Sequence, residues 1–572
     1  AIWQVLQQRL GQSRIAPGQR VLVQEFMQEA LEHGDTRVVE EGLARLRVSL
    51  DSTGELDEGI FTVPESRDPL AEFVEAQPEI ENWLGQTKLY LVSADIKSGL
   101  PHAGIAFGDV EVQRRTEAAG AVEAWRKLKQ QRPWGENRAK HIATLLKYLG
   151  FSAVQGLGIG IEAQDEGQDW LYVQASMTAS DLARPIPQFG SLSRNCYDVV
   201  GFWDSPGPAL VAARLQNLRL STQTVIVLFL GRLSMRQRAD LVRASRAPAA
   251  LAVLDETLLL FLAKESDARL RAFLRCALPL ATINPYTPFQ AGDVPPEMFY
   301  GRERMADELQ RPSGSCLVYG GRQLGKSALL RHVSRNFHYP KRKMYSWVEN
   351  LKLIFLPEAG KETDNIWRAL RESLKEHELL SKRVRTDRPE EIARRLREVM
   401  DETSDLRVLV MFDEADDFLD ADAADGFRQI IGLRELMLQT GRRFKVIFAG
   451  LHSVQRFQGI PDQPLAHYGA PLCVEPLEPV AALALVREPL EVLGYRFDDN
   501  AAALRVLSYT NYHPGLIQLF CQEMLHELRS QRSNTPPPYK FDPRIIGTVY
   551  RKPQVSQRIR ERFDWTLALD VR

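Results

Sequence analysis

The eight residues Gly320-Gly321-Arg322-Gln323-Leu324-Gly325-Lys326-Ser327 have the spacing G-x-x-x-x-G-K-S. An apolar run at 316–319 precedes them and predicts a buried strand, and residues 328–333 predict a helix. In such a strand–loop–helix setting, the glycines let backbone N–H groups face a phosphate at a helix N-terminus, where the helix dipole favours negative charge. The stretch therefore predicts a phosphate-binding loop rather than a chance glycine turn.

Two side chains of this loop have expected roles of their own. Lys326 would neutralise the β- and γ-phosphates of a nucleotide, and Ser327 would hold Mg²⁺. Ala328, the first residue after the loop, completes the expected binding segment of 320–328. The expected cofactors are therefore ATP or ADP with Mg²⁺. GTP stays open, although the sequence shows no base-reading motif of the N-K-x-D kind.

A second apolar run, at 407–412, ends in the acid pair Asp413-Glu414. Continuous apolar runs are typical of strands that are covered on both faces. At the C-terminal end of such a strand, Asp413 would reach the metal ion through water, and Glu414 would act as the base that polarises the attacking water. The alternative is a strand end with two solvated acids.

A third strand is expected at 444–450, followed closely by His452 and Arg456. His452 would sense the γ-phosphate from just past the strand end, and Arg456 would serve as an arginine finger. The alternatives are a histidine that caps a loop and an arginine that is solvated or ion-paired.

Two flanking motifs extend the likeness to a known class. Residues 299–303 (F-Y-G-R-E) resemble the F-x-G-R-E box of AAA+ and STAND-type P-loop ATPases, and residues 511–515 (N-Y-H-P-G) resemble the turn that opens their last lid helix. The resemblance covers about 298–531 and implies a parallel sheet with nucleotide at the C-terminal ends of its strands. It implies a phosphate-loop strand between the acid strand and the neighbours of the third strand. The further nucleotide contacts that it implies are Tyr300, Gly301, Arg302, His513 and Pro514.

Composition limits the other possibilities. The chain has 572 residues, enough for about three or four domains, and its 44% hydrophobic and 26% charged residues are typical of a globular protein. A net charge of −1 provides no overall attraction to nucleic acid or membrane. The five scattered cysteines predict reduced core residues in a cytoplasmic protein, and no apolar run is long enough to span a membrane.

The N-terminal half predicts a small α/β domain. A helix at 138–149 precedes strands at 156–161 and 170–176. This order resembles the restriction-endonuclease-like fold, in which the second strand carries E-x-K or Q-x-K. Here Ser176 stands at the lysine position, and Glu162 is the one candidate acid. The resemblance thus implies a degenerate binding or docking module, and a plain α/β domain is the alternative. The tripeptide 95–97 (D-I-K) is expected to be a solvated strand end rather than a nuclease motif.

The expected fold class is α/β, with a P-loop NTPase core and a C-terminal helical lid. The expected division is a helical region at 1–115, a small α/β domain at 116–283, a linker at 284–297, the ATPase core at 298–478, the lid at 479–531, and a linker with the start of a winged-helix-like domain at 532–572.

The resemblance implies a signalling ATPase in which nucleotide state controls self-assembly or a partner protein, a device typical of bacterial defence against phage. The alternative is a DNA-handling ATPase, similar to origin-binding or restriction-associated enzymes. A structural subunit with a spent ATP site is disfavoured because Lys326, Ser327, Asp413 and Glu414 are all present. No membrane partner is expected.

Overall fold

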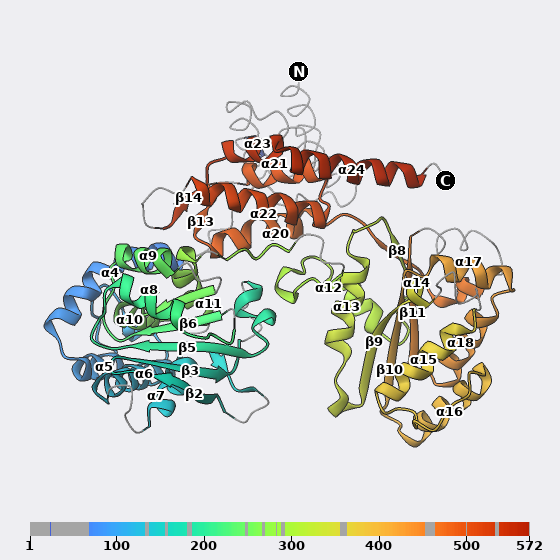
Figure 1. Cartoon of the computed structure of the whole chain (residues 1–572), viewed down its shortest axis with the longest axis horizontal. Coiled ribbons are helices and arrows are strands. Elements are labelled where there is room, and N and C mark those ends of the chain that lie inside the picture. The colour runs from blue at the N-terminus through green and yellow to red at the C-terminus, as the bar shows by residue number, and fades with distance from the viewer. Residues whose placement is uncertain are drawn as a thin grey trace.

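A computed structural model describes residues 23–24, 68–131, 137–154, 158–179, 186–222, 224–245, 250–265, 269–281, 283–287, 292–354, 363–451, 464–498, 500–531 and 537–570. Figure 1 shows two α/β bodies side by side, with a helical body above them. The expected helices within 1–67 fall outside the described residues, apart from two helical residues at 23–24. Among the described residues, no helix is both long and apolar enough to cross a membrane.

The first α/β body begins with helices. They are α4 (Pro69–Gln86), α5 (Leu89–Ser98), α6 (Val112–Gln131) and α7 (Arg138–Tyr148). The tripeptide 95–97 lies on α5, a helix, and not at a strand end. Asp95 is 3.3 Å from Nε2 of His102, so this acid already has a partner.

The sheet of this body has the order β2-β3-β5-β6-β7. Its strands are β2 (Gly160–Glu166), β3 (Trp170–Ser176), β5 (Cys196–Phe202), β6 (Thr224–Phe229) and β7 (Ala250–Leu254). The first three strands are antiparallel, and β5, β6 and β7 are parallel. Side chains of each strand alternate between the two faces of the sheet. Val199 faces the core that is covered by α6, α7, α10 (Glu256–Phe261) and α11 (Arg269–Ala277). Val200 faces the core that is covered by α8 (Pro208–Asn217) and α9 (Met235–Ser245). A short ladder of β1 (Phe151–Ser152) and β4 (Thr178–Ala179) lies beside it.

The second α/β body holds a fully parallel sheet with the order β12-β8-β11-β10-β9. Its strands are β8 (Leu317–Gly320), β9 (Met344–Asn350), β10 (Arg407–Asp413), β11 (Phe444–Gly450) and β12 (Leu472–Val474). Separate cores cover the two faces, one beneath α12 (Glu303–Gln310) and α13 (Lys326–Phe337), the other beneath α15 (Asn365–Glu376), α16 (Pro389–Glu402), α17 (Asp416–Ala424) and α18 (Arg428–Gln439). The short α14 (Leu351–Ile354) follows β9.

This order differs from the expected one in one respect. The strand β11, and not the acid strand β10, is the neighbour of the phosphate-loop strand β8. The strands β8, β10 and β11 are all continuous apolar runs that suit a position covered on both faces, so their patterns do not distinguish one order from another.

The helical body contains the lid helices α20 (Pro479–Val492), α21 (Ala501–Thr510) and α22 (Pro514–Ser530). The tail packs onto them: β13 (Tyr495–Arg496) pairs with β14 (Tyr539–Lys540), and α23 (Arg544–Arg551) and α24 (Pro553–Asp570) lie against α22. Ile545, Ile546 and Val549 of α23 are buried in the core that the lid helices form. The further domain expected from 532 onward stays a prediction.

The lid shares its hydrophobic core with the N-terminal α/β body and not with the phosphate-loop body. One continuous cluster includes Phe273 of α11, Val486 of α20 and Phe520 of α22. Residues 283–287 run between the two parts: the Tyr286 hydroxyl donates to the Val486 carbonyl at 3.0 Å, and the Thr287 N–H donates to Gln518 at 3.0 Å. The lid and the N-terminal body are therefore packed as one unit.

Candidate nucleotide-binding site

The phosphate loop lies between β8 and α13, at the C-terminal edge of the parallel sheet (Figure 1). The helix α13 begins at Lys326, directly after Gly325. Lys326 is buried, and its Nζ donates to the carbonyls of Gly320 at 2.8 Å and Gly321 at 2.9 Å. Burial lowers the pKa of Lys326, while the carboxylates of Asp413 and Glu414 act to raise it.

The expected phosphate ligand fits this environment. Among the described residues, no carboxylate lies within ion-pair distance of Lys326, and its bonds go to neutral carbonyls. A buried ammonium with neutral partners only is incompletely compensated, so a phosphate oxygen would stabilise it. The same space faces the N-terminus of α13, where backbone N–H groups have no intrahelical acceptor.

The acid pair lies at the end of β10. Asp413 is buried, and its Oδ1 accepts the Glu414 N–H at 3.0 Å. Glu414 is exposed and has φ = 53°, in the left-handed region that non-glycine residues rarely adopt. Strained backbone of this kind concentrates at functional sites because the surrounding structure must hold it in place. Asp413 is buried and Glu414 is exposed, so the two acids sit in different environments.

A third acid, Asp416, was not singled out from the sequence. Its Oδ2 accepts the Leu451 N–H at 2.7 Å, which ties the start of α17 to the end of β11. The only sequence signal was its place in the run D-E-A-D at 413–416. His452 and Arg456 follow Leu451 by one and five residues, but 452–463 falls outside the described residues, so their proposed roles stay predictions.

The segment that precedes the core lies on the start of α13. An added Cβ on Gly292 would be 2.7 Å from Cβ of Ser327, so this linker passes directly beside the expected metal ligand. Phe299 stacks on His332 of α13, with ring centroids 3.9 Å apart. His332 was another residue that sequence reasoning missed, because nothing in its local pattern distinguishes it from other residues of the helix.

The F-Y-G-R-E box joins the core to the lid. The Tyr300 hydroxyl donates to Oε2 of Glu488 on α20 at 3.0 Å, and Arg302 donates to the Glu475 carbonyl just after β12. Gly301 has φ = 70°, and an added Cβ would lie 2.3 Å from Cβ of Ala481. Only glycine fits this contact. Tyr300 and Gly301 thus contact the lid, and Arg302 fixes the box to the segment after β12, which is a structural use of residues that we expected near the nucleotide.

The lid also touches the phosphate loop. Nε2 of His513, the residue before α22, is 3.3 Å from the Arg322 carbonyl, and its Nδ1 accepts the Leu516 N–H at 3.4 Å. One neutral tautomer, with its proton on Nε2, makes both bonds. Pro514 is the first residue of α22, and an added Cβ on Gly515 would lie 3.9 Å from the Gln323 carbonyl. The N-terminus of α22 therefore adjoins the phosphate loop.

The N-terminal sheet lacks a comparable site. Ser176 pairs with Gly160, and Glu162 pairs with Gln174, so neither candidate of the nuclease-like motif faces a second acid across the ladder. Asp198 on the next strand is buried and accepts from the Tyr172 hydroxyl. In the described part of the chain, no group of three or more His, Cys, Asp or Glu is arranged to hold a metal ion.

Comparisons with known proteins give little beyond this geometry. No protein-family model and no curated protein matches the chain. The solved structure of Cdc6p from Pyrobaculum aerophilum matches with a TM-score of 0.28 and 14% identity, over 41% of this chain and 64% of that one. Orc1 from Aeropyrum pernix, solved in complex with DNA, matches with a TM-score of 0.28 and 13% identity, over 45% of this chain and 67% of that one. The features that make the second body similar to P-loop proteins are its parallel sheet, the loop between β8 and α13, and the strand β10 that ends in two acids.

Proposed function

We propose that this chain is a Mg²⁺-dependent ATPase of the AAA+/STAND kind whose nucleotide state controls the position of its lid. The observation that carries the proposal is the contact between His513 of the lid and the Arg322 carbonyl of the phosphate loop. A nucleotide phosphate bound beside this carbonyl would change the energy of that contact. Only a ligand that interacts differently with two arrangements can shift their populations.

The chemistry is assigned to residues at the edge of the parallel sheet. Lys326 would leave its loop carbonyls to neutralise the outer phosphates, and Ser327 would bind Mg²⁺, which supplies charge neutralisation when present. Asp413 would hold the ion through water. Glu414 would accept a proton from the water that attacks the γ-phosphorus, as the bond from that phosphorus to the ADP oxygen breaks. His452 and Arg456 keep their proposed roles as sensor and finger.

Nucleotide exchange would move the unit formed by the lid and the N-terminal body relative to the phosphate-loop body. The lid and the N-terminal α/β body share one core, whereas the phosphate-loop body has cores of its own. A lid that swings on nucleotide exchange would carry the N-terminal body with it, around the connections near 292–303 and 475–479. We propose that this movement exposes a surface for self-assembly or for a partner protein. A role in defence against phage is part of this proposal and rests on the resemblance.

The experiment is a distance measurement with nucleotide as the variable. Spin labels at Tyr90→Cys on α5 and Leu438→Cys on α18, both about half exposed in the native chain, report on the two bodies. Cys196 and Cys473, the half-exposed native cysteines, are first replaced by alanine. The distance should differ between ADP and ATP in a Glu414→Gln background, which slows hydrolysis.

The matched control is a second label pair within the proposed rigid unit. Tyr90→Cys paired with Val480→Cys on α20 should give one distance in both nucleotide states, because both sites belong to the unit with the shared core. An unchanged first pair would refute the switch. A change of equal size in both pairs would refute the division into two bodies.

The alternative, a DNA-handling ATPase, has one observation in its favour, which is the charge on the loop between α15 and α16.

A further inference from the structure

The loop between α15 and α16 forms a hollow that is rich in arginine and lies apart from the phosphate loop. The hollow has a volume of about 600 Å³. Its lining residues are Ser381, Arg383, Val384, Arg385, Thr386, Arg388, Glu391 and Arg395. Four arginines against one glutamate make this a concentrated positive site on a chain whose net charge is −1.

Most of this charge has no acid partner. Arg383, Arg385 and Arg388 are exposed, and among the described residues none of them lies within ion-pair distance of a carboxylate. Glu391, the acid of the lining, is already bonded to Arg394 at 2.6 Å and to Arg395 at 3.0 Å. The three loop arginines are therefore available to an external anion.

A buried arginine builds the loop into this shape. Arg371 of α15 donates to the carbonyls of Arg385 at 3.0 Å and Thr386 at 2.9 Å. It also pairs with Asp387, the acid that lies between Arg385 and Arg388 in the sequence. Arg371 thus holds the backbone of the loop and engages the acid nearest to these two arginines in the sequence.

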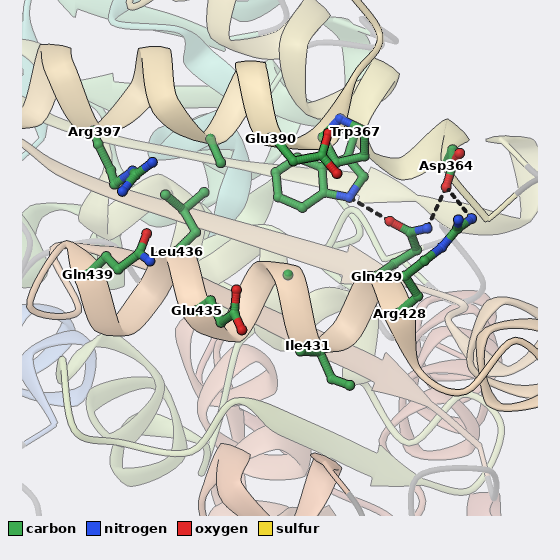
Figure 2. Close-up of a pocket in the computed structure, with 13 residues that line it drawn as sticks. Asp364, Trp367, Glu390, Arg397, Arg428, Gln429, Ile431, Glu435, Leu436 and Gln439 are labelled. Carbon is green, nitrogen blue, oxygen red and sulfur yellow. Dashed lines mark hydrogen bonds and ion pairs between the residues drawn. The ribbon is translucent and has the colours of Figure 1, made fainter.

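A second hollow on the opposite side of α16 shows the contrast (Figure 2). It measures about 490 Å³, and one cation of its lining is paired within it: Arg428 is 3.1 Å from Asp364, and Gln429 donates to the same carboxylate and accepts from Trp367. Its lining holds both acids and cations, so it has no single preference for charge. The arginine hollow differs because three of its four arginines, Arg383, Arg385 and Arg388, have no ion-pair partner among the described residues, whereas Arg395 pairs with Glu391.

We propose that this arginine loop binds the phosphate backbone of a DNA duplex. Guanidinium groups donate in a planar fork that matches phosphate oxygens, and they stay charged at all working pH values. Val384 is the one apolar side chain of the lining, so the site lacks the buried anchor that a protein interface needs. It also lacks an aromatic platform on which the bases of a single strand would stack. Because a protein anchor and an aromatic platform are both missing from the lining, the ligand that fits best is the phosphate backbone of a duplex, bound without regard to base sequence.

The test uses the full chain and a fluorescent DNA duplex of about 30 base pairs with random sequence, measured by anisotropy between about 50 and 200 mM salt. The variant Arg383→Gln/Arg385→Gln/Arg388→Gln should weaken binding at least ~10-fold at the low-salt end. The slope of log K against log salt should become shallower by about 2 to 3, since each lost phosphate contact accounts for about 0.9.

The matched control removes three arginine charges from surfaces outside the hollow. Arg236, Arg311 and Arg496 are exposed arginines outside the hollow, and their triple change to glutamine should leave affinity and slope close to those of the wild type. Equal losses in the two triple variants would overturn the proposal, because general charge and not this loop would then attract DNA. A wild-type protein that does not bind the duplex would overturn it as well.

Two further variants separate this site from other parts of the molecule. Arg371→Gln keeps the loop arginines but removes their clamp, so it should weaken binding by less than the triple change. Lys326→Ala should bind the duplex as the wild type does, because no residue of the loop 320–328 lines the arginine hollow. A failure of nucleotide binding would therefore leave the result for the arginine loop unaffected.

Discussion

The two α/β bodies are built alike and differ in how their acids are used. Each has five strands with helices on both faces. In the N-terminal sheet, Asp198 accepts from the Tyr172 hydroxyl at 2.9 Å, from the Thr222 N–H at 2.8 Å and from its hydroxyl at 3.1 Å. In the second sheet, the bond found to Asp413 comes from the N–H of the next residue. One acid is satisfied within the fold, and the other keeps its capacity to bind.

This difference indicates where chemistry is possible in a layered α/β fold. A carboxylate whose lone pairs are filled by neighbouring donors stabilises a turn, and it has little left for a metal ion or a substrate. The buried pair of Asp255 with Arg238 in the N-terminal body belongs to this structural kind. Substitutions in the two sheets separate these two uses of a carboxylate.

The largest effect is expected at Lys326. Replacing it with alanine removes the cation that would hold the outer phosphates, so nucleotide affinity should fall about 10³-fold, since two charge-assisted bonds contribute about 2 kcal/mol each. Isothermal titration with ATP measures this. Asp198→Asn in the other sheet is the control and should leave affinity unchanged. Retained binding in Lys326→Ala would remove the basis of the whole site.

Glu414→Gln should separate binding from hydrolysis. The amide cannot accept the proton of the attacking water, so ATP turnover should fall about 10²–10³-fold while ATP still binds. Phosphate release and nucleotide titration on the same preparation give the two values. If turnover persists, Glu414 is a solvated strand-end acid like the alternative considered from the sequence.

Asp255→Asn should affect stability and not chemistry. Arg238 and Asp255 are both buried, and removal of one charge leaves the other without its partner, at a cost of about 3–5 kcal/mol. Thermal unfolding should show a lower transition for the N-terminal body. The ATPase rate measured below that transition should match the wild type. A loss of ATPase activity in the folded variant would mean that the N-terminal sheet takes part in the reaction.

Lys445 provides a pH test within the second sheet. Burial lowers its pKa from 10.5 to about 8, and its Nζ donates to the Leu309 and Arg311 carbonyls at the end of α12. Between about pH 8 and 10.5, the unfolded chain holds more protons than the folded one, so this group raises the free energy of unfolding as pH increases. The rise should be on the order of 3 kcal/mol.

Denaturant unfolding at several pH values follows this rise. In Lys445→Met, that part of the pH dependence should be missing, whereas Lys343→Met, which removes an exposed lysine of the same body, should retain it. Identical pH profiles for the wild type and Lys445→Met would show that the lysine is not held at a lowered pKa.

The smallest effect is expected at His513, where two variants distinguish its hydrogen bond to the Arg322 carbonyl from its hydrogen bond to the Leu516 N–H. His513→Asn keeps a side chain that caps α22 but does not reach the Arg322 carbonyl, and His513→Ala loses both bonds. We expect the asparagine variant to retain stability and to lose about 1 kcal/mol of coupling between the nucleotide and the lid. Label distances in ADP and ATP report the coupling. A wild-type response in His513→Asn would show that the lid is controlled elsewhere.

Much of the second body could be predicted because its signals are local. The G-x-x-x-x-G-K-S loop and the acid strand are defined by spacings of a few residues, and the observed α20, α21 and α22 all lie within the range 479–531 that was expected to be helical. The same holds for β3, whose bounds match the expected strand. Asp416, which has only its place in D-E-A-D as a signal, and His332 and Arg371, which have none, were missed because their roles come from distant partners.

The sequence by itself determined that a loop with the spacing G-x-x-x-x-G-K-S, a strand that ends in two acids and a group of C-terminal helices follow one another, since hydrophobic period and glycine spacing act over short distances. Only the tertiary structure decided that β11 lies between β8 and β10, that the C-terminal helices pack with the N-terminal body, and that Arg371 pairs with Asp387 of the arginine loop. These features depend on which buried surfaces meet, and apolar runs of similar composition fit several partners equally well.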